Sequence, residues 1–209
     1  MEEIEVKSFS LGEFATNTYF ILNQKKKTYI IIDAPQGIKS IVENFSKKGF
    51  RPLFLFLTHG HIDHIQGLKE LDLPFYIHYQ DEEFLLKPEL NLSSFLLSPL
   101  IIKKKPSLLK EDKIPLWENL TLEVIHTPGH TPGSVSFKLN NYLFSGDTLF
   151  YDSVGRTDFS YADFNLLCDS LKKITSFDEN TIVFPGHGPS TTLKREKRYN
   201  PFLKECKPI

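Results

Sequence analysis

Thr58-His59-Gly60-His61-Ile62-Asp63-His64 is the most distinctive stretch of this chain, and it lies between an apolar run and a helix-like segment. Four side chains that can bind metal ions occur within six residues, and buried imidazoles and carboxylates need partners. In an extended chain His59, His61 and Asp63 would point to one side, while His64 would project elsewhere. This geometry suits two adjacent metal ions better than one.

Ordinary surface histidines in a polar loop are the alternative interpretation of this stretch. The chain has only seven histidines, and three of them lie here, which disfavours that alternative. The stretch therefore predicts a metal site.

Three later motifs place a histidine or an aspartate beside glycine near a predicted strand. His130 lies between the two Pro-Gly pairs of residues 127–133, and such a rigid loop can hold a ligand without a helix. Asp147 follows an apolar strand and Gly146, and His187 lies in Pro185-Gly186-His187-Gly188-Pro189. These three residues are further candidate ligands.

Two other histidines are predicted to be structural. His78 lies in an alternating strand with no second ligand nearby, and His126 ends a strand, where packing or support of a ligand is expected.

Hydrophobic alternation and turn residues predict a mixed α/β chain. The predicted strands are Ile4–Leu11, Thr18–Leu22, Thr28–Asp33, Leu53–Leu57, Pro74–His78, Leu120–His126, Gly133–Leu139, Tyr142–Ser145 and Thr181–Phe184. The predicted helices are Ile38–Lys48, which Gly49 would stop, and Gln80–Lys87. Leu53–Leu57 is uninterrupted and apolar, as expected for a strand covered on both faces. Residues 88–110 are predicted to be irregular, either packing on the main body or lining a site.

Composition limits the functions that this chain can have. Its 209 residues, 40% of them hydrophobic, are enough for one domain with a substantial core. The formal net charge is -1, so no general attraction to nucleic acid is expected. No apolar run approaches the ~20 residues that span a bilayer, and the acidic start, residues 1–5, does not resemble a signal peptide. Cys168 and Cys206 are expected to be thiols in a reducing compartment, so a cytoplasmic location is predicted.

Taken in order, these motifs resemble the metallo-β-lactamase fold superfamily across essentially the whole chain. Four stretches are further similar to small bacterial hydrolases of the glyoxalase II (hydroxyacylglutathione hydrolase) type, namely Thr127–Ser134, Gly146–Phe150, Gly155–Phe159 and Glu196–Phe202. The resemblance implies an α/β fold, a four-layer αββα sandwich with two mixed β-sheets. Residues 1–209 would form a single domain, with no separate C-terminal helical domain.

The resemblance also implies a set of seven ligands for two divalent ions. His59, His61 and His130 would bind the first, Asp63, His64 and His187 the second, and Asp147 would bridge both. Asp33 resembles a residue that supports ligands, although a turn residue at a strand end is the alternative. Imidazole and carboxylate without thiolate suit zinc first, and also iron or manganese.

The implied activity is hydrolysis of a small-molecule thioester or ester by a metal-bridging water, which Asp63 would help to orient. Arg156 matches a family position that meets a carboxylate of glutathione. Asp158 and Pro189 stand where the family has tyrosines, which weakens glutathione recognition. Lys194, Arg195 or Arg198 would compensate, unless they form a solvated helix face.

The nearest alternative is a persulfide dioxygenase, in which one iron would be held by His59, His130 and Asp147. The stretch Gly155–Phe159 also resembles the corresponding stretch of those enzymes. β-Lactam hydrolysis is not expected, because no cysteine lies near Asp147. Nucleic-acid processing is not expected either, since the chain lacks a basic stripe interleaved with aromatic residues.

Overall fold

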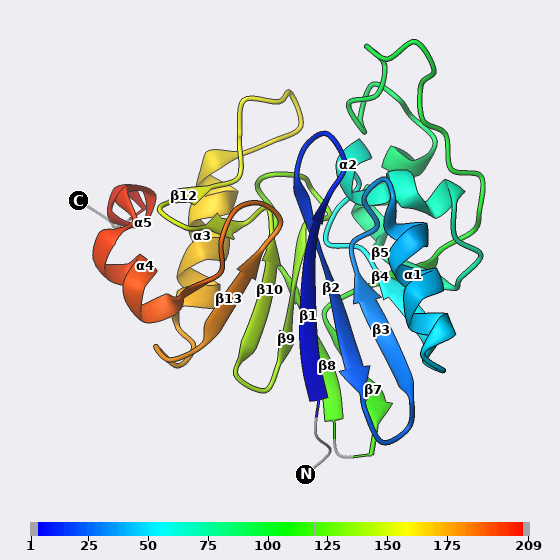
Figure 1. Ribbon diagram of the computed structural model, residues 1–209. Coiled ribbons are helices and arrows are strands. Elements are labelled where there is room, and N and C mark those ends of the chain that lie inside the picture. Colours follow the sequence, from blue (N-terminus) through cyan, green and yellow to red (C-terminus); the bar gives the residue numbers. More distant parts are fainter. Residues whose placement is uncertain (1–3, 119, 207–209) are drawn as a thin grey trace. The chain divides into compact units, whose positions relative to one another are not determined.

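A computed structural model describes residues 4–118 and 120–206 of the chain, so residues 1–3 of the acidic start lie outside it. The chain divides into two compact units, Met1–Leu109 and Lys110–Ile209, called unit 1 and unit 2 below. Figure 1 labels the elements of both. None of the helices in the described part of the chain combines the length and the apolar character of a membrane span.

Unit 1 contains a mixed six-stranded sheet with the order β1-β2-β3-β4-β5-β6. The strands are β1 (Ile4–Leu11), β2 (Thr16–Asn23), β3 (Thr28–Ile32), β4 (Arg51–Phe56), β5 (Phe75–His78) and β6 (Ser107–Leu109). The first three pair antiparallel, and β3 to β6 pair parallel. Helix α1 (Ile38–Lys47) connects β3 to β4 and ends before Gly49, whose φ of 80° confirms the predicted helix stop.

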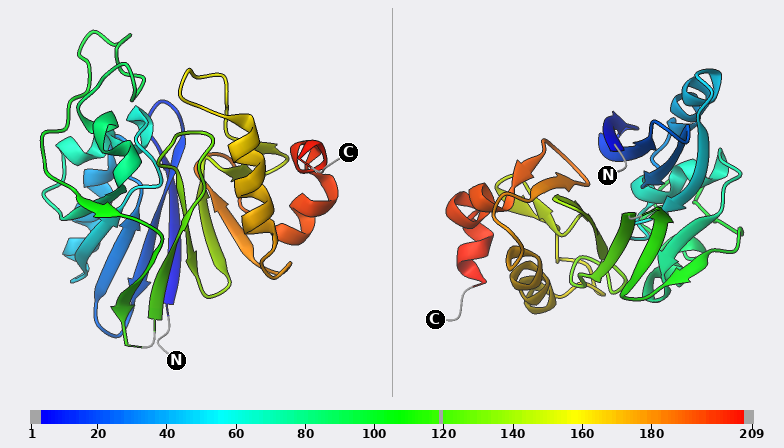
Figure 2. Two further views of the ribbon diagram at one scale, coloured as in Figure 1. Left: turned by 180° about the vertical axis from the view of Figure 1, so that it is seen from behind. Right: turned by 90° about the horizontal axis from the view of Figure 1, so that it is seen from below.

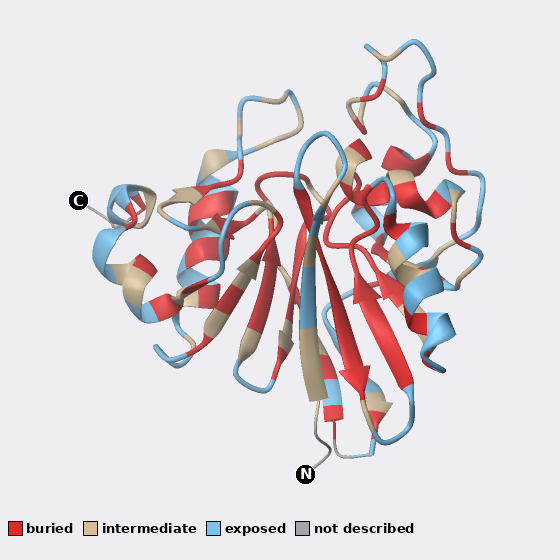
Figure 3. Ribbon diagram, in the orientation of Figure 1, coloured by how far each residue is buried: buried red, intermediate tan, exposed pale blue. Residues whose placement is uncertain are grey.

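Strands β2 and β3 form the fully buried centre of unit 1 (Figure 3). Phe20 stacks on Tyr29 and on Phe45 of α1, with ring centroids 5.3 and 5.2 Å apart, so the helix covers an aromatic core. The prediction that β4 is covered on both faces is wrong for its first half. Leu53 and Phe54 are only half-buried, and full burial begins at Leu55.

Unit 2 contains a second mixed six-stranded sheet, with the order β14-β13-β10-β9-β8-β7. Its strands are β7 (Asp112–Trp117), β8 (Leu120–His126), β9 (Val135–Leu139), β10 (Tyr142–Gly146), β13 (Ile182–Pro185) and β14 (Thr191–Thr192). A separate hairpin pairs β11 (Leu149–Phe150) with β12 (Ser153–Val154). The predicted α/β fold with two mixed sheets is confirmed.

Three helices follow in unit 2, namely α3 (Phe164–Thr175), α4 (Leu193–Tyr199) and α5 (Pro201–Glu205) (Figure 2). The carboxylate of Asp163 accepts hydrogen bonds from the N–H groups of Asn165 and Leu166, which caps the start of α3. Apolar residues of α3 recur every three or four positions and pack with Leu143 and Val183 of the sheet.

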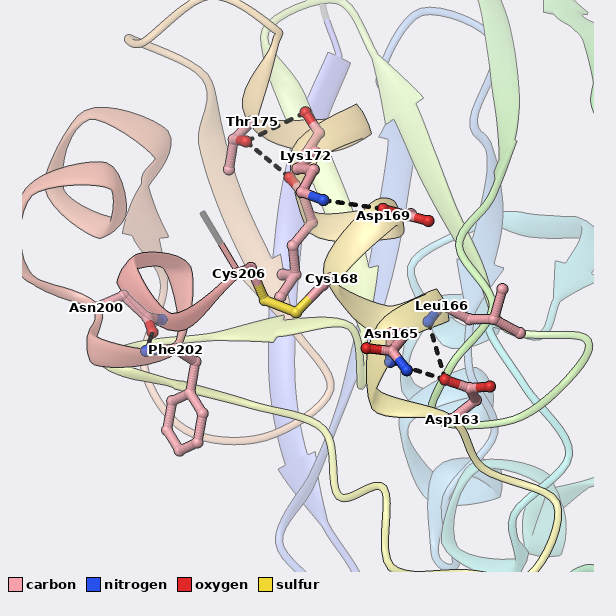
Figure 4. Close-up of a disulfide and its surroundings, with 11 residues drawn as sticks. Asp163, Asn165, Leu166, Cys168, Asp169, Lys172, Thr175, Asn200, Phe202 and Cys206 are labelled. Carbon is pink, nitrogen blue, oxygen red and sulfur yellow. Dashed lines mark hydrogen bonds and ion pairs between the residues drawn. A yellow bond between two sulfur atoms is a disulfide. The ribbon is translucent and has the colours of Figure 1, made fainter. Parts of the chain in front are cut away.

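The two cysteines of the chain form a disulfide, which corrects the expectation of free thiols. Cys168 of α3 pairs with Cys206 directly after α5, with Cα atoms 5.0 Å apart (Figure 4). The pairing was not visible in the sequence, because 38 positions separate the two residues and only the packing of α5 near α3 brings them together. The two cysteines therefore do not support the expectation that the protein is in a reducing compartment.

Candidate metal centre

The histidine-rich stretch of unit 1 follows β4 and changes conformation in its middle. His61 is extended, with φ −71° and ψ 150°, and helix α2 (Ile62–Ile65) begins at the next residue. Asp63 and His64 are therefore helical, and the predicted alternation of three residues along an extended chain is wrong for Asp63. Asp63 Oδ2 nevertheless lies 3.3 Å from Nε2 of His64.

The three histidines of this stretch are fully buried and lie close together. His59 Nε2 is 3.0 Å from His61 Nδ1, and the rings of His59 and His64 have centroids 4.1 Å apart. Nitrogens bound to one tetrahedral zinc ion lie about 3.3 Å apart. The separation of His59 Nε2 and His61 Nδ1 is therefore suited to binding one metal ion.

Asp33, at the end of β3, supports this stretch from inside unit 1. Its carboxylate accepts hydrogen bonds from the backbone N–H of Thr58 at 2.8 Å, from the Thr58 hydroxyl and from His64 Nδ1 at 2.9 Å. A histidine that donates from Nδ1 to a carboxylate presents Nε2 as a metal ligand. The supporting position implied for Asp33 agrees with these contacts.

Two supporting residues of unit 1 were not found from the sequence. The buried carboxylate of Asp81 accepts a hydrogen bond from the N–H of Gly60 at 2.9 Å, and the Thr16 hydroxyl donates to Asp63 Oδ2 at 2.7 Å. A Cβ on Gly60 would come within 2.4 Å of Phe84, so glycine permits close packing there. These partners are 21 and 47 positions apart in sequence, and no local pattern marks them.

The candidate ligands of unit 2 surround the carboxylate of Asp147. Its Oδ2 lies 3.6 Å from His130 Nε2 and 3.6 Å from His187 Nε2. Asp147 and His187 follow β10 and β13, which are parallel and therefore end at the same edge of the sheet. The N–H of Gly186 donates to the carbonyl of Gly146 at 2.8 Å and holds the two strand exits together.

The segment that begins at Gly155 fixes the orientation of His130. His130 Nδ1 donates to the carbonyl of Arg156 at 2.8 Å, which leaves Nε2 directed at Asp147. A Cβ on Gly155 would stand 1.8 Å from the carbonyl oxygen of Asp147 and 3.1 Å from His130, so only glycine allows this approach.

The two remaining histidines make the structural contacts predicted for them. His126 Nε2 is 2.8 Å from the carbonyl oxygen of Pro132, and buried His78 packs against the ring of Tyr79 at 4.6 Å.

Two of the basic residues proposed for substrate contact, Arg156 and Arg195, are already engaged by other side chains, whereas Lys194 and Arg198 are exposed. The exposed Arg156 guanidinium donates two hydrogen bonds to Asp158, at 2.7 and 3.0 Å, and lies over Phe159. The hydrogen bond from Arg156 lowers the pKa of Asp158 below its ordinary value. Arg195 donates to Asp152 and Glu196, so it is not displayed on an open helix face.

The donor chemistry of both clusters fits a divalent metal. Unit 1 gathers three imidazoles and one carboxylate, and unit 2 gathers two imidazoles and one carboxylate. Both cysteines are bound to each other, so they offer no thiolate. Zinc, iron and manganese all accept such ligands.

Comparisons with known proteins give matches along most of the chain. A family model described as "Metallo-beta-lactamase superfamily" matches residues 11–187. The protein named "Probable metallo-hydrolase YqgX" of Bacillus subtilis is 34% identical over 92% of this chain and 94% of its own length. "Hydroxyacylglutathione hydrolase GloC" of Haemophilus influenzae is 30% identical over 96% of this chain and 98% of its own length.

Solved structures agree with these matches. The BLEG-1 B3 metallo-beta-lactamase is 38% identical with a TM-score of 0.88, covering 95% of this chain and 99% of that chain. TTHA1623, solved in a di-iron-bound form, is 35% identical with a TM-score of 0.82, covering 95% and 100%. ETHE1 from Myxococcus xanthus is 25% identical with a TM-score of 0.73, covering 94% and 83%.

Proposed function

Because the chain belongs to the metallo-beta-lactamase superfamily, we propose that it is a metal-dependent hydrolase acting as a thioesterase of the hydroxyacylglutathione hydrolase type. The observation that carries the proposal is the presence of two clusters of imidazole and carboxylate in a chain similar to GloC over nearly its whole length. The proposal treats residues 1–209 as one catalytic domain.

The proposed ligands are those implied by the sequence. They are His59, His61 and His130 for one ion, Asp63, His64 and His187 for a second, and Asp147 as a bridge. When bound, two divalent ions would supply an acidified water and electrostatic stabilisation of a developing oxyanion. Zinc is the first choice, and the di-iron form of TTHA1623 supports including iron.

The chain's own residues would orient the reacting groups. Asp63, which accepts a hydrogen bond from Thr16, is proposed to orient the attacking water. Asp33 and the carbonyl of Arg156 hold His64 and His130 through their Nδ1 atoms. Preorganised groups of this kind lower the cost of reaching the transition state.

The proposed substrate is a small thioester or ester, with Arg156 as the residue that meets a substrate carboxylate. Asp158 already binds this guanidinium, so a carboxylate on the substrate has to compete with it. Both side chains of this ion pair are exposed and solvent screens their attraction, so the competition is modest. A glutathione conjugate is therefore one substrate class to test beside thioesters of neutral thiols.

A mono-iron persulfide dioxygenase is the second candidate function. The resemblance carried by Gly155–Phe159 favours it. The two candidates differ in metal number and in their need for oxygen.

Metal analysis and a substrate panel test the proposal. We expect two metal ions per chain and turnover of lactoylglutathione or another thioester in the panel, which also contains an ester, a β-lactam and glutathione persulfide. One iron with oxygen uptake on the persulfide would favour the second candidate. A metal-replete protein that left every thioester and ester untouched would overturn the hydrolase proposal.

A matched pair of variants sharpens this test. His187→Ala removes a proposed ligand of the second ion, and we expect kcat to fall at least about 100-fold. Lys172→Ala is the control, because Lys172 is exposed on α3 and pairs with Asp169, and its kcat should stay within about twofold of the wild type. A one-iron enzyme would retain most turnover after His187→Ala.

A further inference from the structure

A fully buried carboxylate, Glu196 of α4, lies in the C-terminal stretch that the proposed function leaves unexplained. It accepts four hydrogen bonds. Oε1 accepts from the Thr191 hydroxyl at 2.6 Å and from Arg195 Nη1 at 2.8 Å. Oε2 accepts from the N–H of Asp152 at 2.9 Å and from Asn200 Nδ2 at 3.0 Å.

Two of the four donors belong to segments that adjoin candidate ligands of unit 2, and the other two, Arg195 and Asn200, lie in α4 and at its C-terminal end. Asp152 lies in the turn of the β11–β12 hairpin, which begins two residues after Asp147. Thr191 begins β14, four residues after His187. Glu196 therefore connects the segment that follows Asp147 with the segment that follows His187.

Neighbouring contacts strengthen the same connection. Asn200 Nδ2 also donates to the carbonyl of Ser153 at 3.0 Å, so it binds both Glu196 and the hairpin. Arg195 donates to both carboxylate oxygens of Asp152, at 2.7 and 2.8 Å. Phe150 of the hairpin packs against the ring of His187, with centroids 5.9 Å apart.

The chemistry of the donors explains why this position needs a carboxylate. All four partners donate, and a carboxylate is the side chain that offers acceptors only. A glutamine amide would turn an N–H group towards two donors, and alanine would leave buried donors without an acceptor.

We propose that Glu196 is a positioning residue that sets the separation of Asp147 and His187 by fixing the hairpin against β14. The inference rests on the proposed function and deepens it, because it assigns the C-terminal stretch to the metal centre instead of to substrate recognition. Arg195 has the same assignment, since its guanidinium holds Asp152.

Metal affinity is the readout, because it does not depend on finding the substrate. Zinc dissociation constants are measured by competition with a chromogenic chelator for the wild type, Glu196→Ala and Thr191→Val. We expect Glu196→Ala to weaken at least one bound zinc by about 10- to 100-fold. Thr191→Val keeps the side-chain shape and removes one donor, so it should give a smaller weakening and remains informative if Glu196→Ala fails to fold.

Two controls separate positioning from loss of stability. Cys168→Ser/Cys206→Ser removes the disulfide of the same region without touching Glu196, and Lys197→Ala alters the half-buried neighbour on α4, whose ammonium group pairs with Glu179. Both should bind zinc within about twofold of the wild type. Thermal unfolding of the metal-free proteins shows how far each variant is destabilised.

Two results would overturn the inference. One is wild-type zinc affinity in Glu196→Ala and Thr191→Val. The other is a loss of zinc affinity that is proportional to the loss of stability and is equally large in the disulfide variant. If the wild type binds only one metal ion, the proposed two-ion function fails. The effect of Glu196→Ala is then measured on the affinity for that single ion, for which Asp147 is a proposed ligand in the one-iron alternative.

Discussion

At the scale of single residues, buried carboxylates stabilise the loop that carries the candidate ligands. Asp33 and Asp81 each accept a backbone N–H of this loop, from Thr58 and Gly60. A buried N–H without an acceptor costs about 1–3 kcal/mol, so these carboxylates offset the loss of sheet hydrogen bonds after β4. Asp33 adopts a φ of 62°, a conformation that non-glycine residues rarely take, and its contacts with Thr58 and His64 maintain it.

Tyr29 gives a prediction about stability at high pH. Its hydroxyl is buried among aromatic rings with no hydrogen-bond partner among the described residues, and burial raises its pKa to about 12. The unfolded chain loses this proton near pH 10 while the folded chain retains it, so the free energy of unfolding falls as the pH rises from about 10 to 12. The expected loss from Tyr29 is up to about 2.7 kcal/mol.

Urea unfolding of the wild type and of Tyr29→Phe at pH 8, 10 and 11.5 measures this effect. Tyr29→Phe should be at least as stable as the wild type at pH 8, because it removes an unsatisfied polar atom, and its advantage should grow with pH. Parallel decline of both proteins between pH 10 and 11.5 would contradict the prediction.

At the scale of elements, the disulfide between α3 and the end of α5 gives a second prediction. It closes a loop with a sequence separation of 38, for which the loss of chain entropy in the unfolded state corresponds to about 3–4 kcal/mol. Cys168→Ser/Cys206→Ser should therefore lower the free energy of unfolding by about that amount.

The control for this prediction is the wild type in reductant. Reduced wild type should match the double variant in urea unfolding, and the variant itself should not respond to reductant. A wild type that gains no stability from oxidation would show that the pair does not stabilise α5.

Sequence patterns predicted elements well where one face is clearly apolar. The predicted strand Ile4–Leu11 coincides with β1, and most other predicted strands agree within two or three residues. Strand β7 was missed because it is an edge strand that contains Pro115 and charged residues, so it has little hydrophobic alternation. Helix α3 was also missed, although Asp163 and the apolar spacing that follows it were visible signals.

At the scale of the whole molecule, the candidate ligands were easier to predict than the residues that hold them. The candidate ligands lie in compact motifs at strand exits, and the structure groups their side chains within each unit. Supporting residues such as Thr16, Asp81 and Glu196 act through contacts that only the folded chain creates. A single sequence therefore indicates what chemistry is present, and packing determines how it is oriented. The cytoplasmic location stays a prediction.

The proposed ligand set draws on both units, and this leads to the last prediction. Metal that binds only the folded chain stabilises it by mass action, by about 4 kcal/mol at a free concentration 1,000 times the dissociation constant. For a chain of this length the melting temperature should rise by about 8–16 °C, as measured by differential scanning fluorimetry with and without chelator. His61→Ala in unit 1 and His187→Ala in unit 2 should each lose most of this rise.

His78→Ala and Lys172→Ala are the controls, one in each unit, and should keep the metal-dependent rise even where the metal-free protein melts lower. The comparison separates two ways of binding metal. If ligands of one unit were sufficient, a variant of the other unit would keep the full rise, and the seven-ligand proposal would be wrong. If both ligand variants lose it and both controls keep it, the result supports the seven-ligand proposal, because each variant removes one of the proposed imidazole ligands.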